Sequence, residues 1–434
     1  MNITNFKPSI FNHVVYKNEA IYIINDFYKS YIRFTNNKEI VAEFINKNYK
    51  QAEDYLEIFT YLVQKNVLVP TIRDEKKMFE YKRNRAIYSN AELFITIIPT
   101  LKCNFACIYC YEMDSPQNIT VDILNNIKYF INKNVRRFSS VRINWFGGEP
   151  LLCLNTILSF MEEVNLICKN ACKPIVGQMT TNGYYLTGEV FEKLYRQKIL
   201  YYQVTIDGIS DIQNLYRPSK NGEDTYDRIL KNLIDIRNLK KNNFQIAIRS
   251  NIDVNSYPKA YDLIDVLAKY FCADKRYTYM VCKICNWGGE KILEYKEDTL
   301  EDEEFITVEE NLIQYASKKG LNVFMSEPDE YQSENCDYMN DSAFVVNVDG
   351  QLYNCTLAIN DSGYAIGRIT ESGEIIEYEQ YYEWIPQIDE ECWTCIHLAK
   401  CKGMICPFHR KCNQKKVNTY TDTFINTTMW ETLY

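Results

Sequence analysis

Apolar residues follow different periods in different parts of the chain, and the pattern changes near residue 90. Before that point, alternation from His13 to Asn25 predicts a strand hairpin turning at 17–19. Apolar spacing across 40–62 predicts two amphipathic helices, and 67–70 a closing strand. The charged stretch Arg73–Arg85 is predicted to be a linker. We therefore expect residues 1–90 to form a small α+β domain.

From Leu93 onward, short apolar segments alternate with helical segments, which is typical of parallel β/α construction. The expected strands are 93–99, 141–146, 175–181, 201–207, 244–252 and 276–282. Six strands predict an α/β fold, a partial (β/α)6 TIM-like barrel over 91–285. A bridging region follows at 286–335, and its acidic run at 301–304 is expected to be a solvated surface. Residues 336–434 are cysteine-rich and weak in regular periodicity.

Composition narrows the classes of partner and compartment. A length of 434 residues predicts two to four domains, and a net charge of -8 argues against a nucleic-acid partner. We find no run of about 18 apolar residues and no signal-peptide pattern at the start, so we expect a cytoplasmic protein without a membrane part. The 16 cysteines are then expected to be metal ligands or buried apolar groups, because a reducing cytosol does not keep structural disulfides.

The first cysteine group directly follows the first barrel strand. Cys103, Cys107 and Cys110 form a CxxxCxxC loop at the carboxyl end of that strand, where β/α barrels build active sites. Three thiolates can hold three irons of a [4Fe-4S] cluster and leave the fourth iron without a protein ligand. A zinc ion on the same thiolates is the alternative, disfavoured because no fourth Cys or His lies nearby.

The second barrel strand ends in Gly147, Gly148, Glu149 and Pro150. Glycines permit close backbone approach and Pro150 stops the strand. Main-chain carbonyls together with Glu149 are therefore expected to face an ammonium group.

The CxxxCxxC loop after strand one and the GGEP after strand two resemble the radical S-adenosylmethionine (SAM) enzymes. The resemblance implies that Cys103, Cys107 and Cys110 hold the catalytic cluster and that its open iron chelates the amino and carboxylate groups of SAM. It implies that 147–149 receives the methionine amine and that Tyr109 packs near the adenine.

Three later segments resemble further elements of that family. Thr181-Asn182-Gly183 resembles its TNG, and Thr205-Ile-Asp207-Gly208 resembles its SxDG, with Thr in place of Ser and Arg217 twelve residues after Thr205. The SAM contacts implied by the resemblance are Thr205, Arg217, Asn182 and Asn251. For the two asparagines, a role as turn formers after strands remains an equal alternative.

The second cysteine group occupies 336–412, and its members are Cys336, Cys355, Cys392, Cys395, Cys401, Cys406 and Cys412. Seven thiols with a central CxxC are enough for one or two metal sites, and a zinc ribbon at Cys392 and Cys395 remains an alternative. The arrangement is similar to the SPASM extension of radical SAM peptide maturases. That resemblance implies two auxiliary [4Fe-4S] clusters, three in all, with Cys392, Cys395, Cys401 and Cys412 on the distal one and Cys336, Cys355 and Cys406 on the nearer one.

The spacing departs from the SPASM pattern in one place, since four residues separate Cys401 from Cys406 where three are usual. The nearer cluster has only three obvious ligands, so a fourth comes from elsewhere, with the CxxC at 282–285 one source, or its iron is open to substrate. The remaining cysteines, Cys153, Cys168, Cys172 and Cys272, are expected to be structural.

Residues 1–90 resemble the winged-helix-like peptide-recognition element of such maturases, which pairs a leader peptide with a strand edge; a structural cap on the barrel is the alternative. Together the resemblances imply a radical SAM/SPASM enzyme. Its 5′-deoxyadenosyl radical would abstract hydrogen from a ribosomally made precursor peptide and install a cross-link, with a Cys thioether favoured. An electron donor such as flavodoxin or ferredoxin would serve it.

Three rival functions stay open. Carbon–carbon cross-linking is close to the favoured chemistry. Anaerobic sulfatase maturation is disfavoured because Thr356 stands where those enzymes carry an aspartate. A zinc-binding scaffold or regulator is the non-enzymatic alternative.

Overall fold

The computed structural model describes residues 3–89, 91–288, 295, 299–324, 339–383, 388–395, 398–403 and 430–432. Contacts divide the chain into two compact units. Unit 1 comprises 1–88, 326–339 and 385–434, and unit 2 comprises 89–325 and 340–384. The four-part division expected from the sequence stays a prediction.

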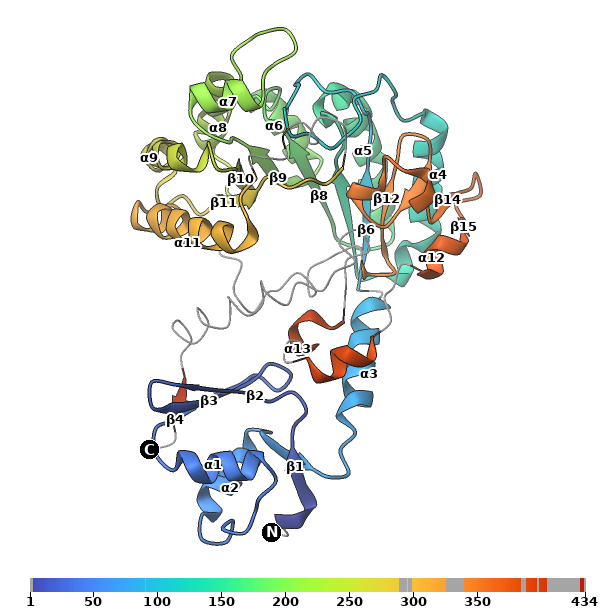
Figure 1. Cartoon of the computed structure of the whole chain (residues 1–434). Coiled ribbons are helices and arrows are strands. Elements are labelled where there is room, and N and C mark those ends of the chain that lie inside the picture. Colours follow the sequence, from blue (N-terminus) through green and yellow to red (C-terminus); the bar gives the residue numbers. More distant parts are fainter. Residues whose placement is uncertain are drawn as a thin grey trace. The chain divides into compact units, whose positions relative to one another are not determined.

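Unit 2 is built on a ten-stranded sheet with the order β11-β10-β9-β8-β7-β6-β12-β13-β14-β15 (Figure 1). Its parallel strands β6 to β11 confirm the α/β fold and all six expected barrel strands. They are β6 (Glu92–Ile97), β7 (Ser140–Trp145), β8 (Ile175–Thr181), β9 (Ile199–Thr205), β10 (Gln245–Ile252) and β11 (Tyr277–Lys283).

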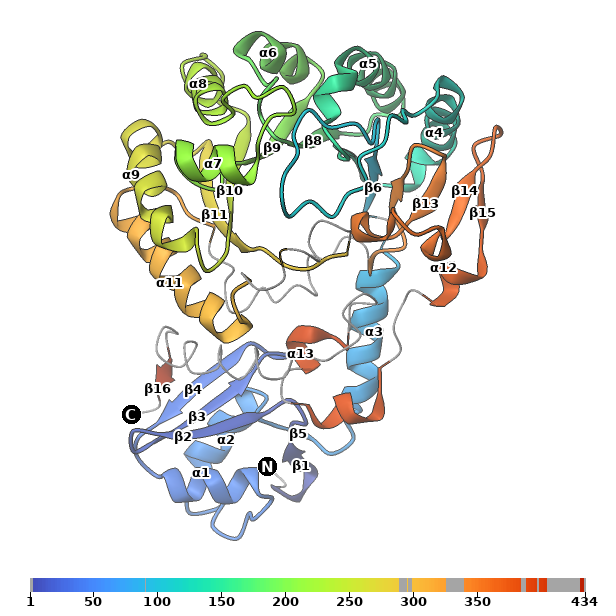
Figure 2. The same ribbon diagram turned by 45° about the horizontal axis from the view of Figure 1, so that its top comes forward.

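Helices follow these strands and cover one face of the sheet in an arc (Figure 2). They are α4 (Val121–Asn134), α5 (Leu154–Asn170), α6 (Gly188–Arg196), α8 (Tyr226–Arg237), α9 (Ala260–Phe271) and α11 (Asp302–Lys318). The short helix α7 (Ser210–Tyr216) lies inside this arc, and its buried apolar residues form a separate apolar cluster with Ile284 (Figure 2). Alternate strand residues such as Ile143, Val204 and Ile248 point to this side and form the main core with the helices. The side chains between them point to the opposite face.

One segment of this helical layer, Pro150–Asn170, is long and apolar enough to cross a membrane by length and composition alone. In the structure, Ile157, Phe160, Val164 and Cys168 on α5 lie in the main core. The apolar face of this helix is thus accounted for by packing against the sheet.

The sheet continues beyond β6 with four strands that the sequence pattern did not predict. β12 (Ala343–Val346) pairs in parallel with β6, and β13 (Gln351–Tyr353), β14 (Gly367–Ile369) and β15 (Ile375–Glu377) extend it in antiparallel fashion. Strands of three or four residues are too short for an alternating pattern to be recognised.

Unit 1 contains a four-stranded sheet with the order β16-β4-β3-β2, and residues of two helices, α1 and α2, contribute to its apolar core. Apart from the helix at 75–87, its described elements are β1 (Phe6–Pro8), β2 (His13–Lys17), β3 (Ala20–Asn25), β4 (Ser30–Phe34), α1 (Lys38–Ile45), α2 (Leu56–Gln64), β5 (Leu68–Pro70), α13 (Leu398–Cys401) and β16 (Glu431–Thr432). The short helix α12 (Glu379–Glu383) belongs to unit 2. The predicted hairpin, both helices and the closing strand are confirmed, and the hairpin turns at Asn18 and Glu19 with positive φ.

The linker expected at Arg73–Arg85 is wrong, because α3 (Glu75–Ile87) occupies this stretch. Asp74 caps the helix by accepting a hydrogen bond from the Lys77 N–H. Phe79, Arg83 and Ile87, spaced four residues apart, form its buried face. The many charges on its other faces concealed that stripe.

A close backbone approach fixes the start of the loop after β6 against the segment after β7. The Gly148 N–H donates to the Thr100 carbonyl at 3.2 Å, and the Glu149 N–H donates to the Lys102 carbonyl at 2.8 Å. A Cβ atom at Gly148 would lie 2.2 Å from the Lys102 oxygen. Only glycine therefore fits between these segments.

We predict that Gly148→Ala lowers the free energy of unfolding by about 3 kcal/mol, because overpacking against a main chain cannot be relieved by a rotamer change. Urea denaturation followed by circular dichroism measures this. Gly188→Ala is the matched control, since a Cβ there meets nothing within 4 Å. Equal stability of the two variants would contradict the close approach.

Candidate active site at the cysteine loop

The loop between β6 and α4 carries Cys103, Cys107 and Cys110 and is held by main-chain hydrogen bonds to a segment distant in sequence. The Ala106 N–H donates to the Pro218 carbonyl at 2.8 Å, and the Ile108 N–H donates to the Tyr216 carbonyl at 3.0 Å. Because the segment at 216–220 follows β9 and the loop follows β6, these bonds carry the loop across the carboxyl ends of the strands between them.

The three thiols lie within electrostatic reach of one another. Burial raises the pKa of Cys103 and of Cys110 to about 12, and the charge of nearby Cys107 adds to both shifts. Without a metal Cys103 and Cys110 are therefore neutral at physiological pH, whereas a bound iron would stabilise their thiolates. The donor set therefore fits an iron–sulfur cluster.

The spacing of these thiols also bears on the choice of metal. Within the described ranges, no three His, Cys, Asp or Glu side chains are grouped so as to hold a single metal ion. A tetrahedral zinc with Zn–S bonds near 2.3 Å would need its sulfurs about 3.8 Å apart. A four-iron cubane is larger and separates its thiolates more widely, and the choice between a cubane and one zinc ion stays a prediction.

Glu149 joins the ends of two strands from a fully buried position. Its carboxylate accepts hydrogen bonds from the Leu151 N–H at 3.0 Å, the Thr181 hydroxyl at 2.7 Å and the Asn182 N–H at 2.8 Å. Burial raises the pKa of Glu149, and these hydrogen bonds partly oppose that shift. The expected contact of Glu149 with an ammonium group stays a prediction.

Tyr109, Arg217 and Asn251, named separately from the sequence, meet at one phenolic oxygen. Arg217 Nη1 and Asn251 Nδ2 donate to the Tyr109 hydroxyl at 2.8 and 3.0 Å, and that hydroxyl donates to Asp207 Oδ2. Asp207 Oδ1 accepts from the Asn251 N–H at 2.8 Å. Burial raises the pKa of both Asp207 and Tyr109. We call these four residues the Tyr109 cluster.

Asp207 is the member of this cluster that the sequence reasoning missed. It belongs to the TIDG segment, in which the resemblance implies a SAM contact only for Thr205. An acid directly after a barrel strand was the available signal. Thr205 itself is buried at the end of β9, next to β10.

Asn182 serves as a turn former and also contacts the cysteine loop. Its Oδ1 accepts from the Tyr184 N–H at 3.0 Å, and its Nδ2 donates to Asn104 Oδ1 at 2.8 Å. The amide also lies 4.0 Å from the Cys103 sulfur. Both interpretations of this residue are therefore compatible with its position.

The sheet face opposite the helices presents polar side chains that are half-buried, except for the fully buried Thr96. Thr96, Asn144 and Gln178 are in register across β6, β7 and β8, and Thr180 pairs with Gln203 across β8 and β9. In-register residues of a parallel sheet point to the same face. These uncharged groups provide hydrogen-bond donors and acceptors below the cysteine loop, and we call them the polar wall.

The second cysteine group is only partly described. Cys336, Cys406 and Cys412 lie outside the described residues. Cys355 follows β13 in unit 2, and Cys392, Cys395 and Cys401 belong to unit 1. Cys282 lies near the end of β11, where burial raises its pKa. The assignment of all these thiols to clusters stays a prediction.

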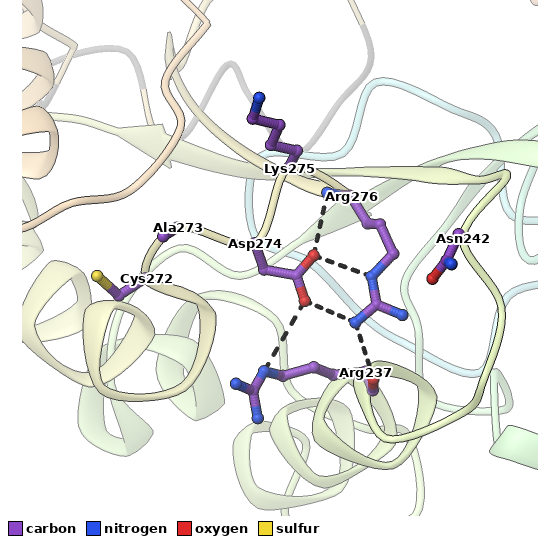
Figure 3. A pocket seen from close by; sticks show the side chains of 7 residues that line it. All are labelled: Arg237, Asn242, Cys272, Ala273, Asp274, Lys275 and Arg276. Carbon is purple, nitrogen blue, oxygen red and sulfur yellow. Dashed lines mark hydrogen bonds and ion pairs between the residues drawn. The ribbon is translucent and has the colours of Figure 1, made fainter.

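A cavity of about 480 Å³ lies at the opposite end of the sheet, where α8 and α9 end and β11 begins (Figure 3). It is lined by Arg237, Asn242, Cys272, Ala273, Asp274, Lys275 and Arg276. Asp274 pairs with Arg276 at 2.6 Å, and Arg276 donates to the carbonyls of Arg237 and Lys241. These bonds tie the end of α8 to β11, which is a structural role.

Comparisons with known proteins match this site. The Radical SAM superfamily profile covers residues 97–253. An uncharacterized protein of Methanocaldococcus jannaschii is 28% identical over 39% of this chain and 57% of its own length. The serine-type anaerobic sulfatase-maturating enzyme of Klebsiella aerogenes is 25% identical over 71% of this chain and 77% of its length. The radical SAM cyclopropyl synthase TigE of Paramaledivibacter caminithermalis is 26% identical over 57% of this chain and 51% of its length.

Solved structures share the fold. The structure of anSMEcpe with bound AdoMet and Cp18Cys peptide has a TM-score of 0.59 at 17% identity, covering 77% of this chain and 97% of that one. Streptococcus suis SuiB bound to precursor peptide SuiA has a TM-score of 0.51 at 12% identity, covering 92% of this chain and 95% of that one.

We predict that Tyr109→Phe lowers the free energy of unfolding by about 2 kcal/mol, because the buried Asp207, Arg217 and Asn251 each lose a hydrogen-bond partner. Chemical denaturation of the metal-free protein provides the measurement. Tyr129→Phe removes a hydroxyl from a side chain that is 59% exposed and should change stability by less than about 0.5 kcal/mol. A Tyr109→Phe variant as stable as the wild type would show that the cluster does not support the fold.

Proposed function

This chain contains a radical SAM domain at residues 97–253, and from that premise we propose that it is a maturase that cross-links a ribosomally made precursor peptide. The observation that carries the proposal is the CxxxCxxC loop held over the carboxyl ends of the parallel strands, with the buried Tyr109 cluster beside it. Relatives and structural neighbours whose names refer to maturation and precursor peptides support this class of substrate.

The residues proposed to hold the cofactors follow from the site. Cys103, Cys107 and Cys110 would bind the catalytic [4Fe-4S] cluster. The turn at Gly147, Gly148 and Glu149 and the residues Tyr109, Asn182, Thr205, Arg217 and Asn251 would bind SAM. Once loaded, a site of this kind supplies a 5′-deoxyadenosyl radical that abstracts hydrogen from a carbon of the substrate.

Several features of this chain prepare the site for that chemistry. Glu149 and three members of the Tyr109 cluster, Asp207, Arg217 and Asn251, are buried, so water has little access to them. Hydrogen bonds already fix the orientation of these side chains, so little reorganisation is needed when ligands bind. The polar wall supplies groups that can pair with the amides of a peptide segment.

Unit 1 offers a docking place for the leader segment of the substrate. Among the strands that the structure describes in this sheet, β3 and β4 lie inside and β2 is at an edge. An edge strand presents unpaired main-chain groups along one side, and an extended peptide can add to it as a further strand. We propose that the leader pairs with β2.

The cross-link and the auxiliary centres belong to the same proposal. Two auxiliary [4Fe-4S] clusters would be held in a SPASM-type arrangement by Cys336, Cys355 and Cys406 and by Cys392, Cys395, Cys401 and Cys412, and they would receive the electron left on the product radical. A Cys thioether is the favoured product. Because the clusters need reducing conditions, the enzyme would act in the cytoplasm with a flavodoxin- or ferredoxin-type donor.

Sulfatase maturation is the second candidate, favoured by the similarity to the Klebsiella enzyme over 71% of this chain. Against it, the residue after Cys355 is the buried Thr356, which has no carboxylate to act as a base.

We predict about twelve irons per chain after anaerobic reconstitution, since three cubanes hold four each. Replacing Cys103, Cys107 and Cys110 together by alanine should leave about eight, because only one cluster is lost. Iron and acid-labile sulfide assays measure both values. Finding about four in the wild type would remove the auxiliary clusters, and bound zinc in place of iron would remove the function.

The function itself is tested by co-expressing the protein with a short cysteine-containing peptide encoded beside it. We expect the recovered peptide to be lighter by two hydrogens in the mass spectrum, with its cysteine no longer alkylated by iodoacetamide. A loss of two hydrogens with a cysteine that is still alkylated would indicate a carbon–carbon link. Activity on a sulfatase peptide alone would indicate the second candidate.

Two variants separate the roles of the clusters in this assay. Cys107→Ala should abolish 5′-deoxyadenosine formation, while Cys412→Ala should retain part of it and yield no cross-linked peptide. Liquid chromatography quantifies the nucleoside. Equal loss in both variants would contradict separate roles.

A further inference from the structure

Arg249 brings a guanidinium to the same sheet face as the polar wall. On β10, Ile246, Ile248 and Ile252 belong to the core beneath the helices, so Arg249 and Asn251 point to the opposite face. In register with Arg249 lie Thr205 on β9 and Met280 on β11. Both neighbours are uncharged.

The orientation of this guanidinium is fixed from one side. Arg249 Nε donates to Asn251 Oδ1 at 2.8 Å, and the Asn251 amide in turn donates to the Tyr109 hydroxyl and Asp207. Arg249 is thereby joined to the Tyr109 cluster by a hydrogen bond. Its two Nη groups are left to act as a planar pair of donors.

Arg249 forms no ion pair with any residue that the structure describes. Asp207 influences it at longer range, but the oxygens of Asp207 are already bonded to Tyr109 and Asn251. A half-buried arginine is stabilised when a carboxylate binds it in a bidentate pair. Arg249 also acts electrostatically on the nearby Cys282 thiol, which is no carboxylate, so a carboxylate from a ligand would complete such a pair.

Two ligands can bring a carboxylate to this place, SAM and the peptide. Arg217 is the arginine beside the cysteine loop, since it bonds to Tyr109 and senses the charge of Cys107. In the proposed function the single carboxylate of SAM is held at the open iron beside that loop, whereas Arg249, although in register with the proposed SAM contact Thr205, reaches the Tyr109 cluster through Asn251. The peptide is therefore the better match for Arg249.

We propose that Arg249 binds a carboxylate of the peptide substrate, so that the modified segment carries an Asp or Glu near the reacting residue. This inference rests on the proposed function and deepens it by naming a feature of the substrate. Arg249 acts as a specificity-determining residue.

The test pans a phage-displayed library of random 12-residue peptides against the reconstituted full-length protein with SAM under anaerobic conditions. The wild type should enrich Asp or Glu at one position of the selected motif at least fivefold over the unselected library. Arg249→Gln should reduce that enrichment to the background, and Arg249→Lys should retain part of it, because lysine keeps the charge and loses the planar fork.

Lys275→Gln is the matched control. It also removes one cation, but from an exposed position in the cavity at the other end of the sheet, and it should keep the wild-type enrichment. Circular dichroism, melting temperature and iron content should be the same for all four proteins, and glutamine at 249 retains a donor for Asn251. Loss of enrichment in Lys275→Gln as well would overturn the assignment.

A second arm identifies the source of the carboxylate. Equilibrium dialysis of SAM without peptide should give affinities within twofold for the wild type and Arg249→Gln. A tenfold loss of SAM affinity, with acidic enrichment unchanged, would assign Arg249 to SAM and overturn the inference. Selection of peptides without an acidic preference would overturn it while leaving the proposed function intact. Selection of no peptide at all by the wild type would also overturn the inference, whereas the co-expression assay above tests the proposed peptide substrate separately.

Discussion

The constraint on which this structure depends is that the cysteine loop must find partners for its main-chain groups outside itself. A buried N–H without a hydrogen bond is costly, and the loop has no helix or strand to satisfy it. Ala106 and Ile108 donate to the segment after α7, and the Gly148 turn donates to the carbonyls that lead into the loop. Because these partners follow β9 and β7, the thiols are positioned by the sheet as a whole.

Buried charge gives the site its second property. Glu149 and Asp207 are carboxyls that burial would neutralise, yet each accepts several hydrogen bonds that favour the ionised form. Arg217 lies close enough to influence both, and it also senses Cys107. The carboxyls, the thiols and the arginine are therefore coupled, so binding a cationic group at this end of the sheet would change the charge balance of all of them.

The sequence predicted the six barrel strands because each is an apolar run long enough to recognise, and the cysteine and GGEP motifs located the site at their ends. It did not predict the meeting of Tyr109 with Arg217 and Asn251, which are 108 and 142 positions away. The periodicity of apolar residues reveals helices and strands, but it gives no information on contacts between residues so far apart in the sequence. Asp207 was overlooked for the same reason, since its partners are visible only in three dimensions. In α3, the high content of charged residues suggested a linker, although Phe79, Arg83 and Ile87 form a buried face along the helix.

The two units divide the task of recognition in the proposed enzyme. Pairing of a leader with β2 would rely on main-chain hydrogen bonds, which depend little on the side chains of the segment to be modified. Once the leader is bound, the modified segment is presented to the barrel at a high effective concentration, so the contacts there can be few and weak. A wall of neutral amides and hydroxyls with one arginine meets that requirement. The arginine provides the single strong discriminating contact among many permissive ones. A substrate that leaves the charge of this arginine unpaired is disfavoured more strongly than one that forms an imperfect hydrogen bond with the neutral groups.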